Sequence, residues 1–392
     1  MSAPYRLYGG AQSPYSRKVE ACLRYKGLPY EWLERTPERA AEFAALAKLP
    51  LLPLLVGADG SALQDSTPIL EALEDRHPEP AAAPEAPVLA FVSALVEDFA
   101  DEWLNKALYH YRWGFEADAR AASEAIALAA LPEATAEQRE AAAQQIREKM
   151  AERGALVGVT GETAAVIEAS FQRTLAALEH ALQGRPFLFG GRPAAADFAL
   201  YGQLGQMLGD PAAGARLSAE APRLAAYLAR MAAPGVEGEV LPAEAALAPL
   251  EALLQEIAEV YLPWLAANGQ AQAANRDRFE LELAGLAFAQ APQRYAARAF
   301  QDLRRRRAGM EDASLTALLE RLGLEALLRL PAREPRRPAE PEADSDALDA
   351  AEPEGAEAEG GAVEHEAAEG EPVVAAADIP PEDETLAREA DA

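Results

Sequence analysis

Ser13-Pro14-Tyr15-Ser16-Arg17-Lys18 is the stretch that decides how the first part of this chain folds. Ser13 is a favourable N-cap residue, and Pro14, as the first helical residue, needs no backbone N–H and has a suitable φ angle. Apolar residues follow at helical spacing, and Gly27 stands where a left-handed residue commonly ends a helix. The stretch therefore predicts a helix whose first turn presents the Ser13 hydroxyl beside unpaired N–H groups and the positive end of the helix dipole. Such a place stabilises a thiolate.

The flanking segments predict strands and a second helix around this one. Residues 5–9 and 30–33 are aromatic-rich segments of the kind that form short strands. Residues 52–56 and 61–63 form a predicted hairpin across an Asp-Gly turn, and Ser66 caps a predicted helix that ends at residue 76. The order of strand, helix, strand, hairpin and helix predicts an α/β domain.

The Ser-Pro-aromatic turn and the helix that ends at Gly27-Leu28-Pro29-Tyr30 resemble the start of a glutathione S-transferase, on a thioredoxin-like N-terminal domain. In the serine-type classes of that family, a serine at this place hydrogen-bonds the sulfur of glutathione, whereas the cysteine-type classes form mixed disulfides. This chain has Ser13 there, and its single cysteine is Cys22, inside the helix. The resemblance therefore implies a bacterial, serine-type protein with conjugation or peroxide-type chemistry rather than thiol transfer.

The resemblance also assigns roles to residues of this first domain. Ser13 is the candidate catalytic residue, which stabilises the thiolate of the cosubstrate glutathione. The family enters its third strand through a cis proline, and Pro53 is the candidate because it precedes the strand directly and lies thirteen residues before Ser66. Pro50 is the competing choice. The backbone of Leu52 is then expected to pair with the cysteinyl backbone of glutathione as a strand would.

Asp65-Ser66 resembles the acidic residue and serine that hold the other end of glutathione in the family. The Ser66 hydroxyl and N–H, at a helix start, suit the γ-glutamyl carboxylate, and Asp65 suits the γ-glutamyl amino group. Lys48 is a candidate for the glycyl carboxylate. Each residue also has a purely structural alternative: Ser13 and Asp65-Ser66 as helix caps, Pro53 as a turn residue and Lys48 as a solvated surface side chain.

The composition indicates a protein of a reducing, cytoplasmic compartment. The chain has 392 residues, 50% of them hydrophobic, and a single cysteine, which excludes a disulfide framework. No apolar run approaches the roughly 20 residues of a membrane span, and the first residues lack the apolar core of a signal peptide. The net charge of −28 argues against nucleic acid and anionic membranes as partners.

Changes in composition divide the chain into five predicted segments. Residues 1–78 form the thioredoxin-like domain, residues 79–87 a proline-rich linker, and residues 88–235 an all-helical domain similar to the C-terminal domain of the transferases. Residues 236–330 form a helical extension with a small β-hairpin. Residues 331–392 carry 20 acidic and 4 arginine side chains and scarcely any aromatic residue, so we predict a disordered acidic tail.

The second half of the chain is predicted to be mainly helical because it is rich in alanine. The predicted helices cover residues 88–115, 116–130, 135–153, 163–183, 197–208, 222–231, 241–265, 292–307 and 314–330. Asp197 resembles the acidic half of the family's capping box, but Ala194 stands where the family has Ser or Thr. We expect Asp197 to accept a hydrogen bond from the N–H of Ala194, and the helix to be weaker by about 1 kcal/mol.

Two further clusters have more than one interpretation. Residues 101–113, with Trp103, Tyr109 and His110, would line a pocket for an apolar electrophile if the resemblance holds, or they form inter-domain packing with buried Asp–Arg pairs. No second histidine lies at ligand spacing from His110, so no metal site is predicted. Arg304–Arg307 is interpreted as a solvated helix end or a docking site for the acidic tail.

The resemblance implies an enzyme that binds glutathione and transfers it to an electrophilic, apolar small molecule. It also implies a homodimer. The alternative is a non-catalytic binding or scaffold protein that keeps the fold and uses the acidic tail for interactions. The missing hydroxyl at Ala194 and the long extension favour this alternative.

Overall fold

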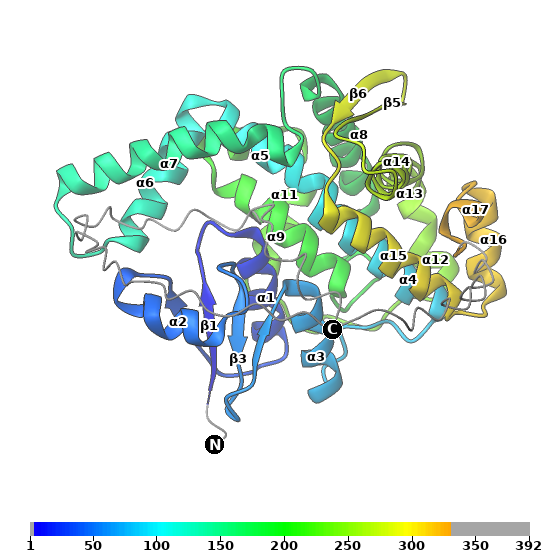
Figure 1. Ribbon diagram of the computed structural model, residues 1–392. Coiled ribbons are helices and arrows are strands. Elements are labelled where there is room, and N and C mark those ends of the chain that lie inside the picture. Colours follow the sequence, from blue (N-terminus) through cyan, green and yellow to red (C-terminus); the bar gives the residue numbers. More distant parts are fainter. Residues whose placement is uncertain (1–3, 331–392) are drawn as a thin grey trace, which may run out of the picture. The chain divides into compact units, whose positions relative to one another are not determined.

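A mixed β-sheet forms the N-terminal part of the computed structural model, which describes residues 4–330 (Figure 1). Residues 331–392, to which the predicted acidic tail belongs, lie outside the described residues. The four strands of this sheet have the order β2-β1-β3-β4. β1 pairs in parallel with β2, and β3 pairs antiparallel with both β1 and β4. The strands are β1 Tyr5–Gly9, β2 Tyr30–Glu34, β3 Leu54–Val56 and β4 Ala62–Gln64.

Successive side chains of the strands point to opposite faces of the sheet and pack against two different layers of helices. Leu7 and Leu55 belong to the large core on the side of α1 and α3, whereas Tyr8, Leu54 and Phe43 form a smaller cluster with α2. Successive strand residues point to opposite faces, so both faces of the sheet are covered. The helices are α1 Pro14–Tyr25, α2 Ala40–Leu46 and α3 Ser66–Arg76, with a short 3₁₀ turn η1 Pro37–Arg39 before α2. This is the predicted thioredoxin-like arrangement.

The ends of α1 are formed by the residues that the sequence indicated. Ser13 is the N-cap, and its side chain accepts a hydrogen bond from the N–H of Ser16. Gly27 has φ of 63°, in the left-handed region that a non-glycine residue would adopt at a cost. The start of α3 differs from the prediction, because Asp65 is the N-cap residue and Ser66 is already the first residue of the helix.

The next part of the described chain is all helical, as predicted. Its helices are α4 Pro87–Phe99, α5 Asn105–Gly114, α6 Glu116–Ala130, α7 Ala136–Val157, α8 Ala164–Ala181, α9 Ala195–Gly209, α10 Pro211–Glu220 and α11 Pro222–Met231. A π-helical turn, η2 Ala100–Leu104, joins α4 to α5. Neither this turn nor α10 was predicted.

Helix α9 packs against α1 and holds the two domains together. Gly202 makes this approach possible, since a Cβ at that position would lie 2.6 Å from the carbonyl oxygen of Pro14. The predicted half of the capping box at the start of α9 is present, because Asp197 Oδ2 accepts a hydrogen bond from the N–H of Ala194 at 2.8 Å. Asp197 Oδ1 also accepts from the N–H of Leu188 and from the hydroxyl of Tyr227.

The predicted extension is present and contains helices and a hairpin. Its elements are α12 Ala243–Leu247, η3 Ala248–Leu250, α13 Glu251–Glu256, the π turn η4 Ile257–Tyr261, α14 Leu262–Ala273, β5 Phe279–Leu283, β6 Leu286–Gln290, α15 Arg294–Ala308, α16 Ala313–Arg321 and α17 Glu325–Leu328. β5 and β6 pair antiparallel across Ala284 and Gly285, both with positive φ. Helices α15 and α16 pack against α4, so the extension is joined to the preceding domain (Figure 1).

Candidate functional site

The Ser13 hydroxyl lies at the start of α1 and is oriented by a second serine. Ser13 Oγ accepts a hydrogen bond from the N–H of Ser16 at 3.1 Å and another from the Ser16 hydroxyl at 3.0 Å. Ser16 Oγ in turn accepts from the N–H of Gly10 at 3.3 Å. With both acceptor positions of Ser13 used, the hydroxyl hydrogen of Ser13 has no acceptor among residues 4–330. The Ser13 side chain is therefore arranged as a donor.

Leu52 and Pro53 lie on the same side of the sheet end as Ser13. A Cβ built on Gly10 would lie 3.7 Å from Leu52 Cδ1 and 3.7 Å from Ser13 Cβ, so these two side chains flank Gly10. The Leu52–Pro53 peptide bond is cis, as the resemblance implied for Pro53. The structure thus brings Ser13 and the start of β3 together.

Asp65 and Ser66 lie at the start of α3. Asp65 has φ of 76° and makes no hydrogen bond from its side chain to the helix start, so it does not act as a conventional cap. Ser66 is 3% exposed. A non-glycine residue with positive φ is strained by about 1–3 kcal/mol, and such residues concentrate at functional sites. The Asp65 carboxylate instead accepts a hydrogen bond at 2.6 Å from the hydroxyl of Tyr295, on α15 of the extension.

A buried lysine lies next to this position and connects the two domains. Lys18 Nζ lies 2.8 Å from Glu97 Oε1, 2.5 Å from Asp101 Oδ2 and 3.0 Å from Thr67 Oγ1. Thr67 donates to Glu97 at 3.0 Å. Burial acts to lower the pKa of Lys18, but the attraction of Asp101 and Glu97 outweighs burial and raises that pKa. Lys18 is therefore charged and fully paired.

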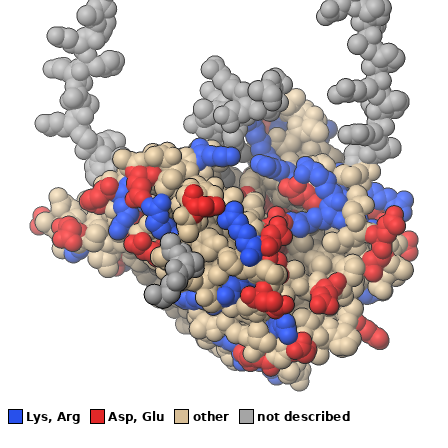
Figure 2. All heavy atoms as spheres, turned by 90° about the horizontal axis from the view of Figure 1, so that it is seen from below, with Lys and Arg blue, Asp and Glu red and all other residues tan. Residues whose placement is uncertain are grey.

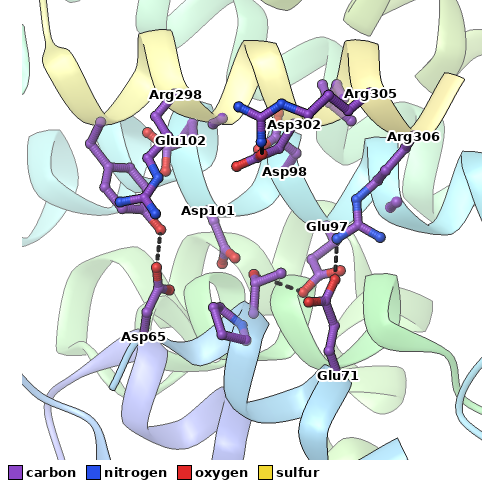
Figure 3. A pocket seen from close by; sticks show the side chains of 16 residues that line it. Asp65, Glu71, Glu97, Asp98, Asp101, Glu102, Arg298, Asp302, Arg305 and Arg306 are labelled. Carbon is purple, nitrogen blue, oxygen red and sulfur yellow. Dashed lines mark hydrogen bonds and ion pairs between the residues drawn. The ribbon is translucent and has the colours of Figure 1, made fainter. Parts of the chain in front are cut away.

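A cavity of about 350 Å³ lies between α3, the α4–η2 helix and α15 (Figure 3). It contains Asp65 but neither Ser13, Leu52, Pro53 nor Ser66. Its charged lining consists of Asp65, Glu71, Glu97, Asp98, Asp101, Glu102, Asp302, Arg298, Arg305 and Arg306. This is the Asp65 end of the candidate site, and the extension supplies one of its walls.

Three carboxyl groups of this cavity have raised pKa values. Burial, the largest cause, raises the pKa of Asp98 to about 7 and that of Asp101 to about 6. Burial, with repulsion from Asp98 and Asp101, raises the pKa of Glu102 well above its usual range. Asp98 accepts a hydrogen bond from the Tyr261 hydroxyl at 2.5 Å. These carboxyl groups therefore keep their protons to a higher pH than usual, and a positively charged group bound in the cavity would favour their ionised forms.

The arginine run of α15 takes part mainly in contacts within the described chain. Arg306 pairs with Glu71 of α3, Arg305 pairs with Asp302, and Arg307 makes a two-bond pair with Glu325. Arg304 donates to the carbonyl of Leu327. In Figure 2, basic and acidic side chains are interspersed over the face shown. The prediction of a solvated helix end was therefore wrong for most of the run, since these side chains connect the extension to itself and to α3.

The aromatic residues of the α4–α5 helix pack in the core. Trp103 is 2% exposed, donates to Ser170 Oγ at 2.8 Å and contacts Trp264. Of residues 101–113, only Asp101 and Glu102 line the described cavity. The interpretation as packing holds here, with a buried pair between Arg112 and Asp210.

The remaining candidate side chains give no further chemistry. Cys22 is fully buried, and burial raises the pKa of its thiol to about 12, which suppresses its reactivity. His110 contacts Glu168. Among residues 4–330, no group of three or more His, Cys, Asp and Glu side chains is placed to hold a metal ion. No helix of the described chain has both the length and the apolar character of a membrane span.

Two family models match this chain. Residues 7–81 match the glutathione S-transferase N-terminal domain, and residues 132–230 match the glutathione S-transferase C-terminal domain. The two matched segments cover less than half of the chain, so the chain is similar to this family in these two segments. The extension lies beyond both matched segments. Among curated proteins, an uncharacterised GST-like protein of Escherichia coli strain K12, YibF, is 31% identical over 111 residues. That match covers 27% of this chain and 54% of YibF, so the chain spans about half the length of this relative.

Several solved structures align with this chain at low identity. The β-etherase LigF of Sphingobium sp. strain SYK-6 is 22% identical with a TM-score of 0.43, covering 60% of this chain and 96% of LigF. A glutathione S-transferase of Methylobacterium radiotolerans, in complex with glutathione sulfonate, is 22% identical with a TM-score of 0.37. The alignment covers 61% of this chain and 99% of that transferase. A glutathione transferase family member of Pseudomonas fluorescens Pf-5, with two glutathione molecules bound, is 19% identical with a TM-score of 0.37. The alignment covers 63% of this chain and 92% of that protein. The similarity to the glutathione S-transferase family rests on the two domain models.

Sequence reasoning missed four residues of the site. Ser16, Lys18, Tyr295 and Arg298 were not among its candidates. Ser16 follows Ser13 by three residues, which is the N-cap to N3 spacing, so its contact with Ser13 was detectable. Lys18 lies on the buried side of α1, but its partners come from distant helices. Tyr295 and Arg298 belong to an extension that no motif connected to α3.

Proposed function

We propose that this protein binds glutathione, stabilises its thiolate and transfers it to an electrophilic, apolar small molecule. The observation that carries the proposal is the Ser13 hydroxyl. It stands at the N-terminus of α1 and receives two hydrogen bonds from Ser16, which leaves its own hydrogen available as a donor. A thiolate is the acceptor that such a donor serves in this family.

The chemistry follows from the charge of the sulfur. A free cysteine thiol has a pKa of about 8.5, so only a small part is ionised at neutral pH. A hydroxyl donor and the positive end of a helix both favour the anion and lower the thiol pKa. The thiol proton goes to solvent, and the thiolate sulfur forms a bond to the electrophilic carbon as the leaving group departs. Ser13 stabilises the nucleophile and does not attack.

The rest of the peptide is held, in this proposal, by the start of β3 and the start of α3. The Leu52 backbone before Pro53 pairs with the cysteinyl residue, while Ser66 and Asp65 bind the γ-glutamyl carboxylate and amino group. The presence of Asp65 in a cavity next to α3 supports this placement. We further propose a homodimer in the cytoplasm, which size-exclusion chromatography with light scattering tests.

Glutathione affinity is the deciding measurement. Calorimetry on the wild type and on Ser66→Ala should give binding that weakens on substitution. A chromogenic chloronitrobenzene then tests turnover, with Ser13→Ala as the catalytic variant. A folded wild-type protein that does not bind millimolar glutathione would refute the proposal.

One observation favours the alternative of a non-catalytic binding protein. The Tyr295 hydroxyl, from an extension outside both matched segments, already donates a hydrogen bond to one oxygen of Asp65, so this end of the site differs from what the resemblance implied. Under this alternative the protein binds glutathione or a related peptide without turnover. Binding in the calorimeter with no conjugation of several electrophiles would support it.

A further inference from the structure

Two charged groups of the cavity between α3, η2 and α15 make no hydrogen bond or ion pair within the described chain. Arg298 makes no hydrogen bond or ion pair among residues 4–330, and neither does Glu102, although both line the cavity with Asp65. The other charged groups of the lining are paired, for example Glu71 with Arg306 and Glu97 and Asp101 with Lys18. The guanidinium of Arg298, an exposed side chain, and the carboxyl group of the partly buried Glu102 therefore face the same open pocket.

Helix α15 directs Arg298 toward Asp65. Tyr295 and Arg298 are three residues apart, which places them on the same face of α15. Tyr295 donates to Asp65 Oδ2, and the second oxygen, Oδ1, has no hydrogen-bond partner among residues 4–330. In Figure 3, the Arg298 side chain extends from α15 toward the end of the cavity where Asp65 lies. Tyr295 thus holds Asp65 in place and leaves one carboxylate oxygen for a ligand.

We propose that α15 completes the ligand site: Arg298 binds the α-carboxylate of an α-amino-acid headgroup, and Asp65 and Glu102 bind its ammonium group. Guanidinium and carboxylate groups pair through two parallel hydrogen bonds, and an ammonium has three donors for carboxylate oxygens. The γ-glutamyl end of glutathione is such a headgroup. The proposal rests on the proposed function for the identity of the ligand and adds residues that lie outside both family domains.

The mixed charge of the cavity favours a zwitterion over a simple cation or anion. A polyamine would leave Arg298 without a partner and would add a repelling charge beside it. A simple anion would leave the carboxyl groups of Asp65 and Glu102 without a partner and would disfavour their ionised forms. A headgroup with both charges satisfies Arg298 and the carboxylates together.

Calorimetry with three peptides tests this on the full chain. The peptides are glutathione, γ-aminobutyryl-cysteinyl-glycine, which lacks the α-carboxylate, and glutaryl-cysteinyl-glycine, which lacks the α-amino group. The variants are Arg298→Ala and Glu102→Gln, with Arg294→Ala as the matched control, because Arg294 is an exposed arginine of α15 that does not line the cavity. Circular dichroism and thermal melting confirm that each variant is folded.

The expected result is selective. Arg298→Ala weakens the binding of glutathione by about 10-fold or more, as expected for loss of a hydrogen bond to a charged group. It leaves the affinity for the peptide without the α-carboxylate unchanged. Glu102→Gln weakens the binding of glutathione and leaves the affinity for the peptide without the α-amino group unchanged. Arg294→Ala changes the affinity for none of the three peptides. Equal weakening of all three peptides by Arg298→Ala would overturn the proposal.

The outcomes separate this proposal from the proposed function. If Ser66→Ala weakens glutathione binding and Arg298→Ala does not, Arg298 takes no part in binding and only the present proposal fails. If the folded wild type binds none of the peptides, both proposals fail.

Discussion

The hydroxyl of Tyr295 donates a hydrogen bond of 2.6 Å to the carboxylate of Asp65, and 230 residues of sequence separate the two. The bond connects an extension helix with the residue that begins α3. Asp65 has positive φ and no cap contact of its own, so Tyr295 is the described side chain that holds its carboxylate. Any ligand at the Asp65 end of the site is therefore affected by the extension.

Tyr295→Phe removes this hydrogen bond and keeps the ring. We expect glutathione affinity to fall by about 3- to 10-fold, which is the effect of one hydrogen bond of about 1 kcal/mol. The affinity for glutaryl-cysteinyl-glycine, which lacks the amino group that Asp65 binds, should not change. Calorimetry measures both. Tighter glutathione binding by Tyr295→Phe would show that Tyr295 competes with the ligand instead of positioning Asp65.

Ser13→Ala separates the catalytic role of Ser13 from its role as a cap. Loss of the donor should raise the thiol pKa of bound glutathione and lower kcat by about 10²-fold, as for other donors to a developing charge. Stability should fall by about 1 kcal/mol from loss of the cap. The pH dependence of thiolate absorbance in the ultraviolet measures the thiol pKa. Unchanged turnover per folded molecule would leave Ser13 as a cap only.

Ser16→Ala tests the orientation of Ser13. The variant keeps the backbone N–H of Ser16 that Ser13 accepts but loses the hydroxyl that occupies the second acceptor position. The Ser13 hydroxyl can then rotate, so we expect a kcat loss smaller than that of Ser13→Ala and an intermediate thiol pKa. Ser16→Thr, which retains a hydroxyl, is the matched control. If Ser16→Ala has the same kcat and the same thiol pKa of bound glutathione as the wild type, Ser16 does not position Ser13.

Lys18→Met should destabilise the protein strongly. The substitution leaves the carboxylates of Glu97 and Asp101 buried without their cation, a change that costs about 3–5 kcal/mol. Urea unfolding measures the loss. The triple variant with Glu97→Gln and Asp101→Asn removes the unpaired charges and should recover much of the stability. A Lys18→Met variant as stable as the wild type would show that the network contributes little.

Asp98→Asn should change how stability depends on pH. The pKa of Asp98 is raised to about 7 in the folded protein, against about 3.9 in an unfolded chain. Between these values the folded state binds more protons than the unfolded state, so stability falls as pH rises. The amide keeps an acceptor for Tyr261 and cannot ionise. The free energy of unfolding of Asp98→Asn should therefore exceed that of the wild type by about 1 kcal/mol or more at pH 8, with a smaller difference at pH 4.

Urea unfolding at several pH values measures this difference. Asp101→Asn is a useful comparison, because Asp101 is paired with Lys18 and its loss removes an attraction as well as a buried charge. A difference between Asp98→Asn and wild type that does not grow with pH would contradict the raised pKa of Asp98.

Local sequence determined the elements that depend on neighbouring residues. Ser13 and Pro14 begin α1, Gly27 ends it, and the Asp-Gly turn joins β3 to β4, because caps and tight turns are decided within a few residues. The candidates Ser13 and Pro53 therefore followed from motif and spacing. The hairpin of the extension followed from its alternating pattern in the same way.

Only the tertiary structure decided which distant groups meet. The contact of Tyr295 with Asp65, the burial of Lys18 between two domains and the free Arg298 in an acidic cavity all depend on how helices far apart in sequence pack. The π turn that carries Asp101 and Glu102 has no short sequence signal. Hydrophobic periodicity specifies that a helix is buried on one face, but it does not specify the partner of that face. The charges that line this site were therefore visible in the sequence, and their arrangement was not.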